Sequence, residues 1–104
     1  MKKVFVIDAA DNVGTAVVAA IQKGEQIGTN GRITDVEVTA NADIPYGHKI
    51  ALADIPAGST VMKYGLSIGT ASADIKAGDH VHVHNVESNR GRGDLIEKTQ
   101  VAAE

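Results

Sequence analysis

The stretch "IPYGHKIALADIPAGSTV", residues 44–61, contains the pattern I-P-x-G-x-x-[IV] twice in succession. Pro45 and Pro56 favour position i+1 of a β-turn, because the proline ring fixes φ near the value that this position requires. We expect Gly47 and Gly58 at i+3, in a backbone conformation with positive φ or in close contact with another chain segment. The apolar residue at each end of the pattern is expected to anchor a flanking strand in the core.

The same pattern without its proline occurs twice more, as "IQKGEQI" at 21–27 and "IKAGDHV" at 75–81. The four glycines are 23, 11 and 20 residues apart, so the chain is not a regular solenoid. We call each copy a turn module and number the modules one to four along the chain. Ala-Asp precedes modules two, three and four, and this repetition favours a structural role for the three carboxylates over acid–base chemistry, namely those of Asp43, Asp54 and Asp74.

Short β-branched segments around the modules predict an all-β fold. The stretch 11–22 is compatible with a helix, but strands occupy the same place before the other modules, so a strand is preferred there. We therefore expect a small, irregular, barrel-like domain over residues 1–87 and a polar tail or linker over 88–104. The predicted strands are "KVFVI", "GTAVVAAI", "DVEVTA", "HKIALADI", "TVMKYG", "IGTASADI" and "HVHVHNV".

Composition excludes several functional classes. The net charge is -3 and aromatic residues make up 3% of the chain, which argues against a nucleic-acid-binding module. The sequence contains no run of about 18 apolar residues, so no membrane-spanning helix is predicted. The chain has no cysteine and therefore no thiol nucleophile or disulfide framework. A cytoplasmic location fits these features.

Three of the four histidines lie in "GDHVHVHN", residues 78–85, at positions 80, 82 and 84. On a continuous strand these three imidazoles would share one face, and Val81 and Val83 would face the core. Two imidazoles at this spacing can bind one metal ion, although such a pair on a strand is more often a solvated face than a ligand pair. His48 directly follows the glycine of module two and is the candidate third member.

Three segments together resemble the amino-terminal SAF-type domain of altronate and galactarate dehydratases, and the small subunit of sulfolactate sulfo-lyase. These segments are "DNVGTAV", residues 44–85 from "IPYGHKIAL" to "HVHVHN", and "NRGRGD", so the resemblance runs from about residue 11 to 94. It implies a β-clip fold and a β-elimination that requires a divalent ion, Fe²⁺ or Mn²⁺. It also implies a large catalytic domain or subunit as partner and a small sugar acid as substrate.

From this resemblance we expect a site in which His48 is the catalytic acid or base and His82 and His84 bind the metal. His80, at the start of the strand, is expected to be dispensable. Substrate contacts are assigned to Asn12, Lys49, Asn85 and Arg90, although a lysine or an arginine of this kind is more often a solvated surface charge.

The expected function is that of the small part of an altronate dehydratase-type hydro-lyase, which forms a 2-keto-3-deoxy acid and is active only with its large partner. Two alternatives stay open. One is the small subunit of a sulfolactate sulfo-lyase, and the other is a non-catalytic module that binds a sugar acid or docks a partner.

Overall fold

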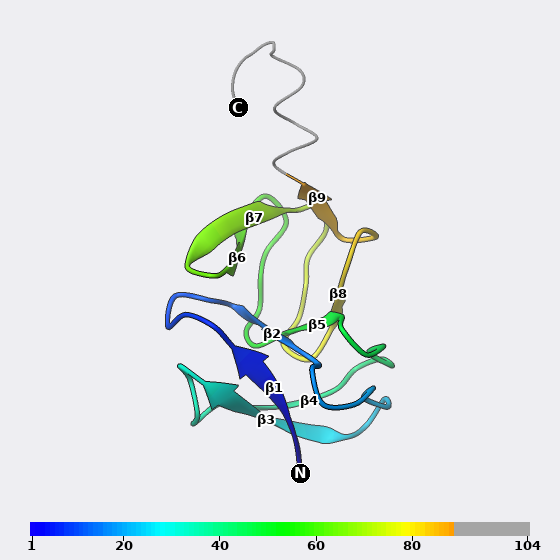
Figure 1. Ribbon diagram of the computed structural model, residues 1–104. Coiled ribbons are helices and arrows are strands. Elements are labelled where there is room, and N and C mark those ends of the chain that lie inside the picture. The colour runs from blue at the N-terminus through cyan, green and yellow to red at the C-terminus, as the bar shows by residue number, and fades with distance from the viewer. Residues whose placement is uncertain (89–104) are drawn as a thin grey trace.

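The computed structural model describes residues 1–88 and builds them from strands and turns (Figure 1). The predicted all-β fold is confirmed, and the helical alternative over 11–22 is wrong, because this stretch contains a short strand and no helix. None of the described residues forms a helix long and apolar enough to cross a membrane. The strands are β1 (Lys2–Val6), β2 (Val13–Thr15), β3 (Gln26–Gly31), β4 (Glu37–Thr39), β5 (Lys49–Ala51), β6 (Thr60–Lys63), β7 (Leu66–Ala71), β8 (His80–Val81) and β9 (Val86–Ser88).

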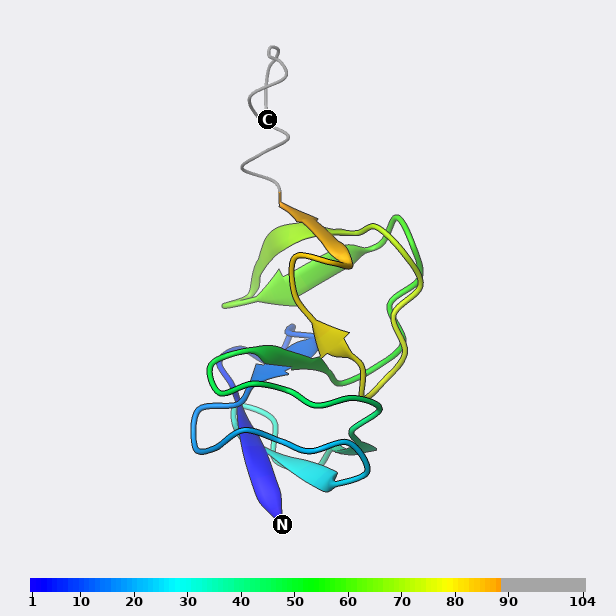
Figure 2. The same cartoon turned by 90° about the vertical axis from the view of Figure 1, so that its right-hand side faces the viewer.

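The strands form two sheets. The larger has the order β4-β3-β1-β2-β5-β8 and curls into a half-barrel, and the smaller has the order β6-β7-β9. All neighbouring strands are antiparallel except the parallel pair β1 and β3. Figure 2 shows the small sheet stacked over the larger one, with two long connections running between them along one side.

The four turn modules share one turn geometry. In each module, the N–H of the residue that follows the glycine donates a hydrogen bond to the C=O of the residue two places before the glycine. In module two, for example, His48 N–H donates to Pro45 C=O at 3.0 Å. The glycine therefore occupies position i+2, and its φ of 84° to 94° is the value that a type II turn requires there. Positive φ at the module glycines is confirmed, whereas the predicted places of proline at i+1 and glycine at i+3 are wrong by one residue.

The modules fasten one another in pairs. Isolated bridges join Ile21 to Ile44 and Ile55 to Ile75, so module one pairs with two, and three with four. Asp54 accepts a hydrogen bond from the N–H of Ala77, and Asp74 accepts one from the N–H of Ala57, both at 2.9 Å. Asp43 does the same for the N–H of Lys23 at 2.8 Å. These contacts confirm the structural role predicted for the three repeated carboxylates.

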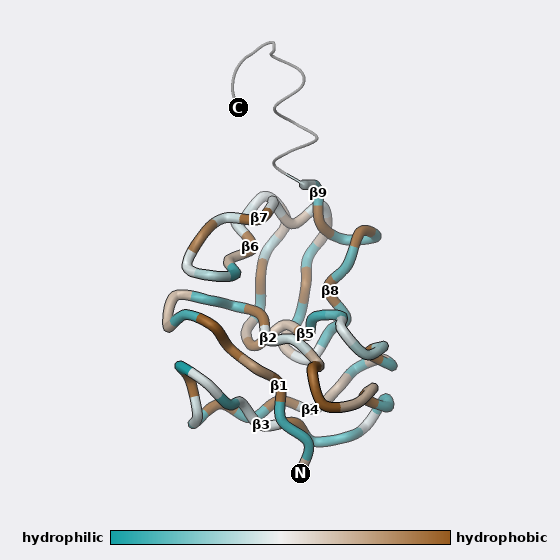
Figure 3. The backbone as a smooth tube through the Cα atoms, viewed as in Figure 1, coloured by the Kyte–Doolittle hydropathy of each residue, from teal (hydrophilic) through white to brown (hydrophobic). Residues whose placement is uncertain are grey.

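Each module pair contributes to its own hydrophobic core. Ile50 belongs to the core that contains the apolar ends of modules one and two, whereas its neighbour Ala51 belongs to the core of modules three and four. In Figure 3, β1 and parts of the two long connections are brown, the colour of hydrophobic residues. The prediction that the module ends anchor the core is confirmed, because all eight are at most 2% exposed: Ile21, Ile27, Ile44, Ile50, Ile55, Val61, Ile75 and Val81.

Several strands differ from the sequence-based prediction. The strand predicted as "GTAVVAAI" ends at Thr15, and Val17 and Val18 beyond it are exposed. The segment "HVHVHNV" is not one strand, because β8 ends at Val81 and a turn over 82–85 separates it from β9. Val83 is therefore 82% exposed and does not face the core. Strand β3 was not predicted, since "QIGTNG" contains two glycines and an asparagine, which are residues typical of turns.

Candidate metal centre

Pairing of β5 with β8 brings together histidines from distant parts of the chain. In the antiparallel register Lys49 lies opposite Val81 and Ile50 lies opposite His80. His48 directly precedes β5 and His82 directly follows β8, so the register continues to His48 opposite His82, with His80 two residues along the chain from His82. The sequence indicated His48 as the third member of a group, and the strand pairing supplies the contact.

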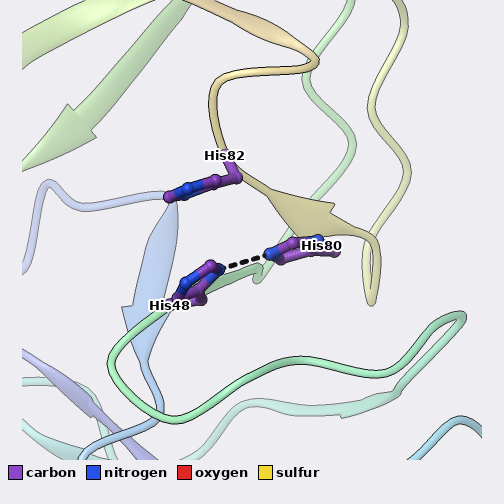
Figure 4. A group of neighbouring side chains, drawn as sticks. All are labelled: His48, His80 and His82. Atoms are coloured by element: carbon purple, nitrogen blue, oxygen red, sulfur yellow. Dashed lines mark hydrogen bonds between the residues drawn. The ribbon is translucent and has the colours of Figure 1, made fainter.

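The imidazoles of His48, His80 and His82 form a compact cluster, which we call the histidine cluster (Figure 4). His48 Nδ1 lies 2.9 Å from His80 Nε2, and the rings of His48 and His82 stack with centroids 4.0 Å apart. One nitrogen from each residue lies within 4.8 Å of the other two. Three imidazole ligands with further positions open are typical of a catalytic metal site, and imidazole is a suitable ligand for iron, so these residues fit a divalent ion.

The membership of the cluster differs from the expectation. His80, expected to be dispensable, is hydrogen-bonded to His48, whereas His84 lies in the exposed turn with its ring centroid 5.2 Å from that of His80. The difference follows from the end of β8 at Val81, because the alternation of strand faces does not continue to residue 84. The functional roles assigned to these residues stay predictions.

Burial and neighbouring positive charge favour the neutral imidazoles. Burial lowers the pKa of His80 below its ordinary value, and the charges of His84, His48, His82 and Lys49 lower it further. Burial also lowers the pKa of His82, followed by the charges of His48, Lys49 and His84. At neutral pH the two rings are thus in the form that binds metal ions.

His48 follows the glycine of its turn module, and in two other modules the residue at this position stabilises the turn. The residue after the module glycine is Glu25 in module one and Asp79 in module four. Each side chain accepts a hydrogen bond from a backbone N–H at the start of its own turn, at 2.7 Å and 2.9 Å. His48 makes no such bond and reaches His80 instead. This exchange of a turn-stabilising carboxylate for an imidazole is a functional signal that the sequence already contains.

Two of the predicted substrate contacts have structural partners. The side chain of Asn85 is buried, accepts a hydrogen bond from His82 N–H at 3.0 Å and donates one to His80 C=O at 2.8 Å. It therefore holds the turn that positions two members of the histidine cluster. The side chain of Asn12 bonds the backbone of Thr60 and Met62 and fastens β6 to the start of β2. Substrate binding by either asparagine stays a prediction.

Of the remaining predicted contacts, Lys49 lies at the site and Arg90 lies outside the described residues. Lys49 is half-buried and lines a cleft of about 180 Å³ between the two sheets. Burial lowers the pKa of its ammonium, and the nearby charge of Lys63 lowers it further. His82 lines the same cleft, so the lysine and the histidine cluster share one opening.

Comparisons with known proteins place the chain in a family. The family model of the altronate/galactarate dehydratase SAF domain matches residues 2–89. The chain is 46% identical over 83 residues to altronate dehydratase of Escherichia coli, and 44% identical over 89 residues to altronate dehydratase of Bacillus subtilis. These matches cover 80% and 86% of the chain but only 16% and 17% of the two relatives. It is also 40% identical to (2R)-sulfolactate sulfo-lyase subunit alpha of Chromohalobacter salexigens, over 83% of the chain and 95% of that subunit.

Proposed function

Because the chain belongs to the family of altronate/galactarate dehydratase SAF domains, we propose that it is the small SAF-type part of a lyase that acts on a sugar acid. The proposed reaction is the β-elimination of water from an altronate-like acid to give a 2-keto-3-deoxy acid. The observation that carries the proposal is the histidine cluster, because three imidazoles from two strand ends converge beside a cleft in a chain of this family.

The proposed cofactor is a divalent ion, Fe²⁺ or Mn²⁺, held by His48, His80 and His82. When bound, such an ion supplies positive charge that stabilises the carboxylate side of the substrate as the α-proton leaves. The imidazoles contribute uncharged ligands, and Asn85 keeps two of them in place through the turn over 82–85. Lys49 provides a positive charge beside the ligands for an acidic substrate group.

Which group accepts the α-proton depends on the role of His48. If His48 binds the ion, its bound nitrogen cannot accept a proton, and we expect the general base to come from the large partner. The expectation from the sequence has His48 as the acid or base and His82 and His84 as the metal ligands, so it leaves His48 free to accept or donate a proton. Metal affinity of a His48 variant separates these two arrangements.

The proposed partner is a large domain or subunit that completes the active site. The chain spans about one sixth of the altronate dehydratases that it matches, so most of each relative lies outside the similarity. A second candidate is the small subunit of a sulfo-lyase, which the coverage of 95% of a sulfolactate sulfo-lyase subunit alpha supports. A non-catalytic sugar-acid-binding module is the third reading, and retention of substrate binding without turnover in the assembled complex would favour it.

The test measures Mn²⁺ binding by electron paramagnetic resonance for the chain and for four alanine variants. Replacement of His48, His80 or His82 removes a ligand and should weaken binding by at least about 10- to 100-fold, since changes to groups that only orient the ligands already have effects of this size. His84→Ala is the matched control on the exposed turn and should stay within about twofold. Equal losses for His80→Ala and His84→Ala would contradict the proposed ligand set.

The activity test uses the same proteins with and without a large dehydratase partner. We expect no turnover of altronate by the chain alone, and turnover after reconstitution. Wild-type turnover without the partner would contradict the proposed division of the active site. Turnover of sulfolactate but not altronate by the complex would establish the second candidate instead.

A further inference from the structure

The turn over 82–85 joins the two sheets beside the cleft. β8 belongs to the larger sheet and β9 to the smaller one, and Figure 2 shows the segment between them crossing from one sheet to the other. The N–H of Asn85 donates a hydrogen bond to His82 C=O at 3.1 Å, so these four residues form a β-turn with Val83 at position i+1. Val83 therefore lies next to a member of the histidine cluster, at a position that also lines the cleft.

Val83 is an unusual residue for this position. Turns favour proline, glycine and small polar residues, whereas β-branched apolar residues favour strands, so the turn itself gives no reason for a valine. The side chain of Val83 is 82% exposed although it lines the cleft. A single exposed apolar residue is ordinary on a protein surface, but this one continues an apolar surface that begins inside the cleft.

The inner wall of the cleft is the edge of a hydrophobic core. Seven residues line the cleft, and four of them are isoleucine or valine, namely Ile68, Val81, Val83 and Val86. Val81 is 1% exposed and belongs to the core of modules three and four, and Ile68 and Val86 are half-buried and pack against that core. An apolar group that entered the cleft would therefore extend this core.

The size and the lining of the cleft suit one large apolar side chain. Its volume of about 180 Å³ is similar to that of an engineered apolar cavity of about 150 Å³ that holds one benzene ring. A sugar acid fits the apolar part poorly, because its hydroxyl groups would lose their hydrogen bonds to water against isoleucine and valine. We therefore expect an apolar side chain there, and not the substrate.

The family comparison indicates where such a side chain comes from. The matches cover only 16% and 17% of the two altronate dehydratases, so a large region of each relative lies outside the similarity. The family model ends at residue 89, and Ser88 lines the cleft, so any part of a relative that follows the matched domain begins beside this cleft.

We propose that the cleft is the docking site of the large partner, which inserts one large apolar side chain between Ile68, Val83 and Val86 and thereby covers the histidine cluster. This inference rests on the proposed function and names the contact through which the partner reaches the site. It also gives Val83 a role, because an exposed valine at the edge of an apolar pocket becomes buried when the partner binds.

The experiment measures binding of the 104-residue chain to a defined partner by isothermal titration calorimetry. The partner is altronate dehydratase of Bacillus subtilis from which the matched segment of 89 residues is deleted, and circular dichroism checks that it is folded. Val83→Ser removes the apolar side chain, and Val83→Ile keeps it. Val18→Ser is the matched control, because Val18 is 75% exposed and does not line the cleft.

A second measurement needs no partner protein. In ¹H–¹⁵N NMR titrations of the chain, N-acetyl-leucine amide represents the inserted side chain and N-acetyl-serine amide is the polar control. We expect the leucine compound, but not the serine compound, to shift the amide signals of residues 68, 83 and 86. The shifts should be weaker in Val83→Ser and unchanged in Val18→Ser.

In the calorimetric experiment Val83→Ser should weaken partner binding by about 5- to 20-fold, the scale of one aliphatic side chain removed from the centre of an interface. Val83→Ile and Val18→Ser should stay within about twofold of wild type, because neither removes an apolar group from the cleft. All three variants should unfold at the wild-type temperature, since both valines are exposed in the isolated chain.

Wild-type affinity of Val83→Ser for the partner, or the absence of shifts with the leucine compound, would overturn the inference. A lower unfolding temperature of Val83→Ser would overturn it too, because the cleft would then be filled by the chain itself. So would a dimer of the chain in analytical ultracentrifugation that Val83→Ser dissociates, since the occupant would be a second copy. Failure of the proposed function gives a different result: partner binding would still depend on Val83, but Mn²⁺ would not bind through the histidine cluster and the complex would turn over neither altronate nor sulfolactate.

Discussion

Gly78 and Gly58 provide a matched pair in which the same substitution should have different costs. Both occupy position i+2 of a module turn, with φ of 94° and 87°. Alanine at either position must adopt a left-handed conformation, which costs about 1–2 kcal/mol. A Cβ at Gly58 meets no atom within 4 Å, so this backbone cost is the whole effect.

At Gly78 the new Cβ would overlap the carbonyl oxygen of Thr39 and lie 3.1 Å from its carbonyl carbon. The obstacle is backbone, which cannot rotate away as a flexible side chain does. Overpacking of this kind costs about 1–3 kcal/mol more, so Gly78→Ala should be destabilised by about 2–5 kcal/mol in total. For a domain of this size, 1 kcal/mol changes the unfolding temperature by about 4–8 °C, so the two variants should differ by at least about 4 °C.

Thermal unfolding followed by circular dichroism measures this difference, and urea unfolding at 25 °C measures the free energies directly. Gly24→Ala is a second control, since its position also has a positive φ and no atom within 4 Å of the added Cβ. Equal unfolding temperatures for Gly58→Ala and Gly78→Ala would refute the reasoning, because the contact with Thr39 would then contribute nothing. Because Gly78 lies two residues before His80, Gly78→Ala should also weaken Mn²⁺ binding, whereas Gly58→Ala should not.

Three further changes test the turns and the site. Asn85→Ala removes two hydrogen bonds of the turn over 82–85 and should cost about 1–3 kcal/mol in urea unfolding, whereas an unchanged free energy would show that the turn holds without them. Asp54→Ala leaves the N–H of Ala77 without its acceptor and should cost about 1 kcal/mol, with Asp54→Asn losing less because the amide oxygen still accepts. The pKa of Glu25 is lowered from 4.5 by its hydrogen bonds to Gln22 N–H and Lys2, so the charged form stabilises the folded state above that pH. The unfolding temperature of Glu25→Gln should therefore lie below wild type at pH 7, and the gap should close as the pH falls through the lowered pKa; a gap that is as large at pH 2 as at pH 7 would contradict this assignment.

Much of the fold was predictable because the turn module is a local feature. Ile55, Gly58 and Val61 fix a turn and two buried strand ends within seven residues, and the same spacing recurs at all four modules. The exact turn register was not predictable from the proline alone. Pro45 and Pro56 satisfy the φ of position i as well as that of i+1, and the hydrogen bonds decide between them.

The site was less predictable because it depends on long-range pairing. Alternation assigned His82 and His84 to one face, but Asn85 bonds the backbone of His80 and His82 and bends the chain before residue 84. An asparagine after alternating residues can end a strand in this way, and that signal was overlooked. The contact of His48 with His80 arises from the register of β5 on β8, over 32 residues of separation, and no local pattern encodes it.

The position of β5 between two cores has a consequence for the motions of the histidine cluster. The amides of Ile50 and Ala51 belong to residues packed on opposite sides of the sheet, so neither core can loosen without disturbing this strand. Their hydrogen exchange should require global unfolding, whereas amides of the turn over 82–85 should exchange through local opening. We therefore expect His48 and Lys49, at the start of β5, to be held rigidly. His82, at the start of the turn over 82–85, can adjust its position when a ligand or a partner binds.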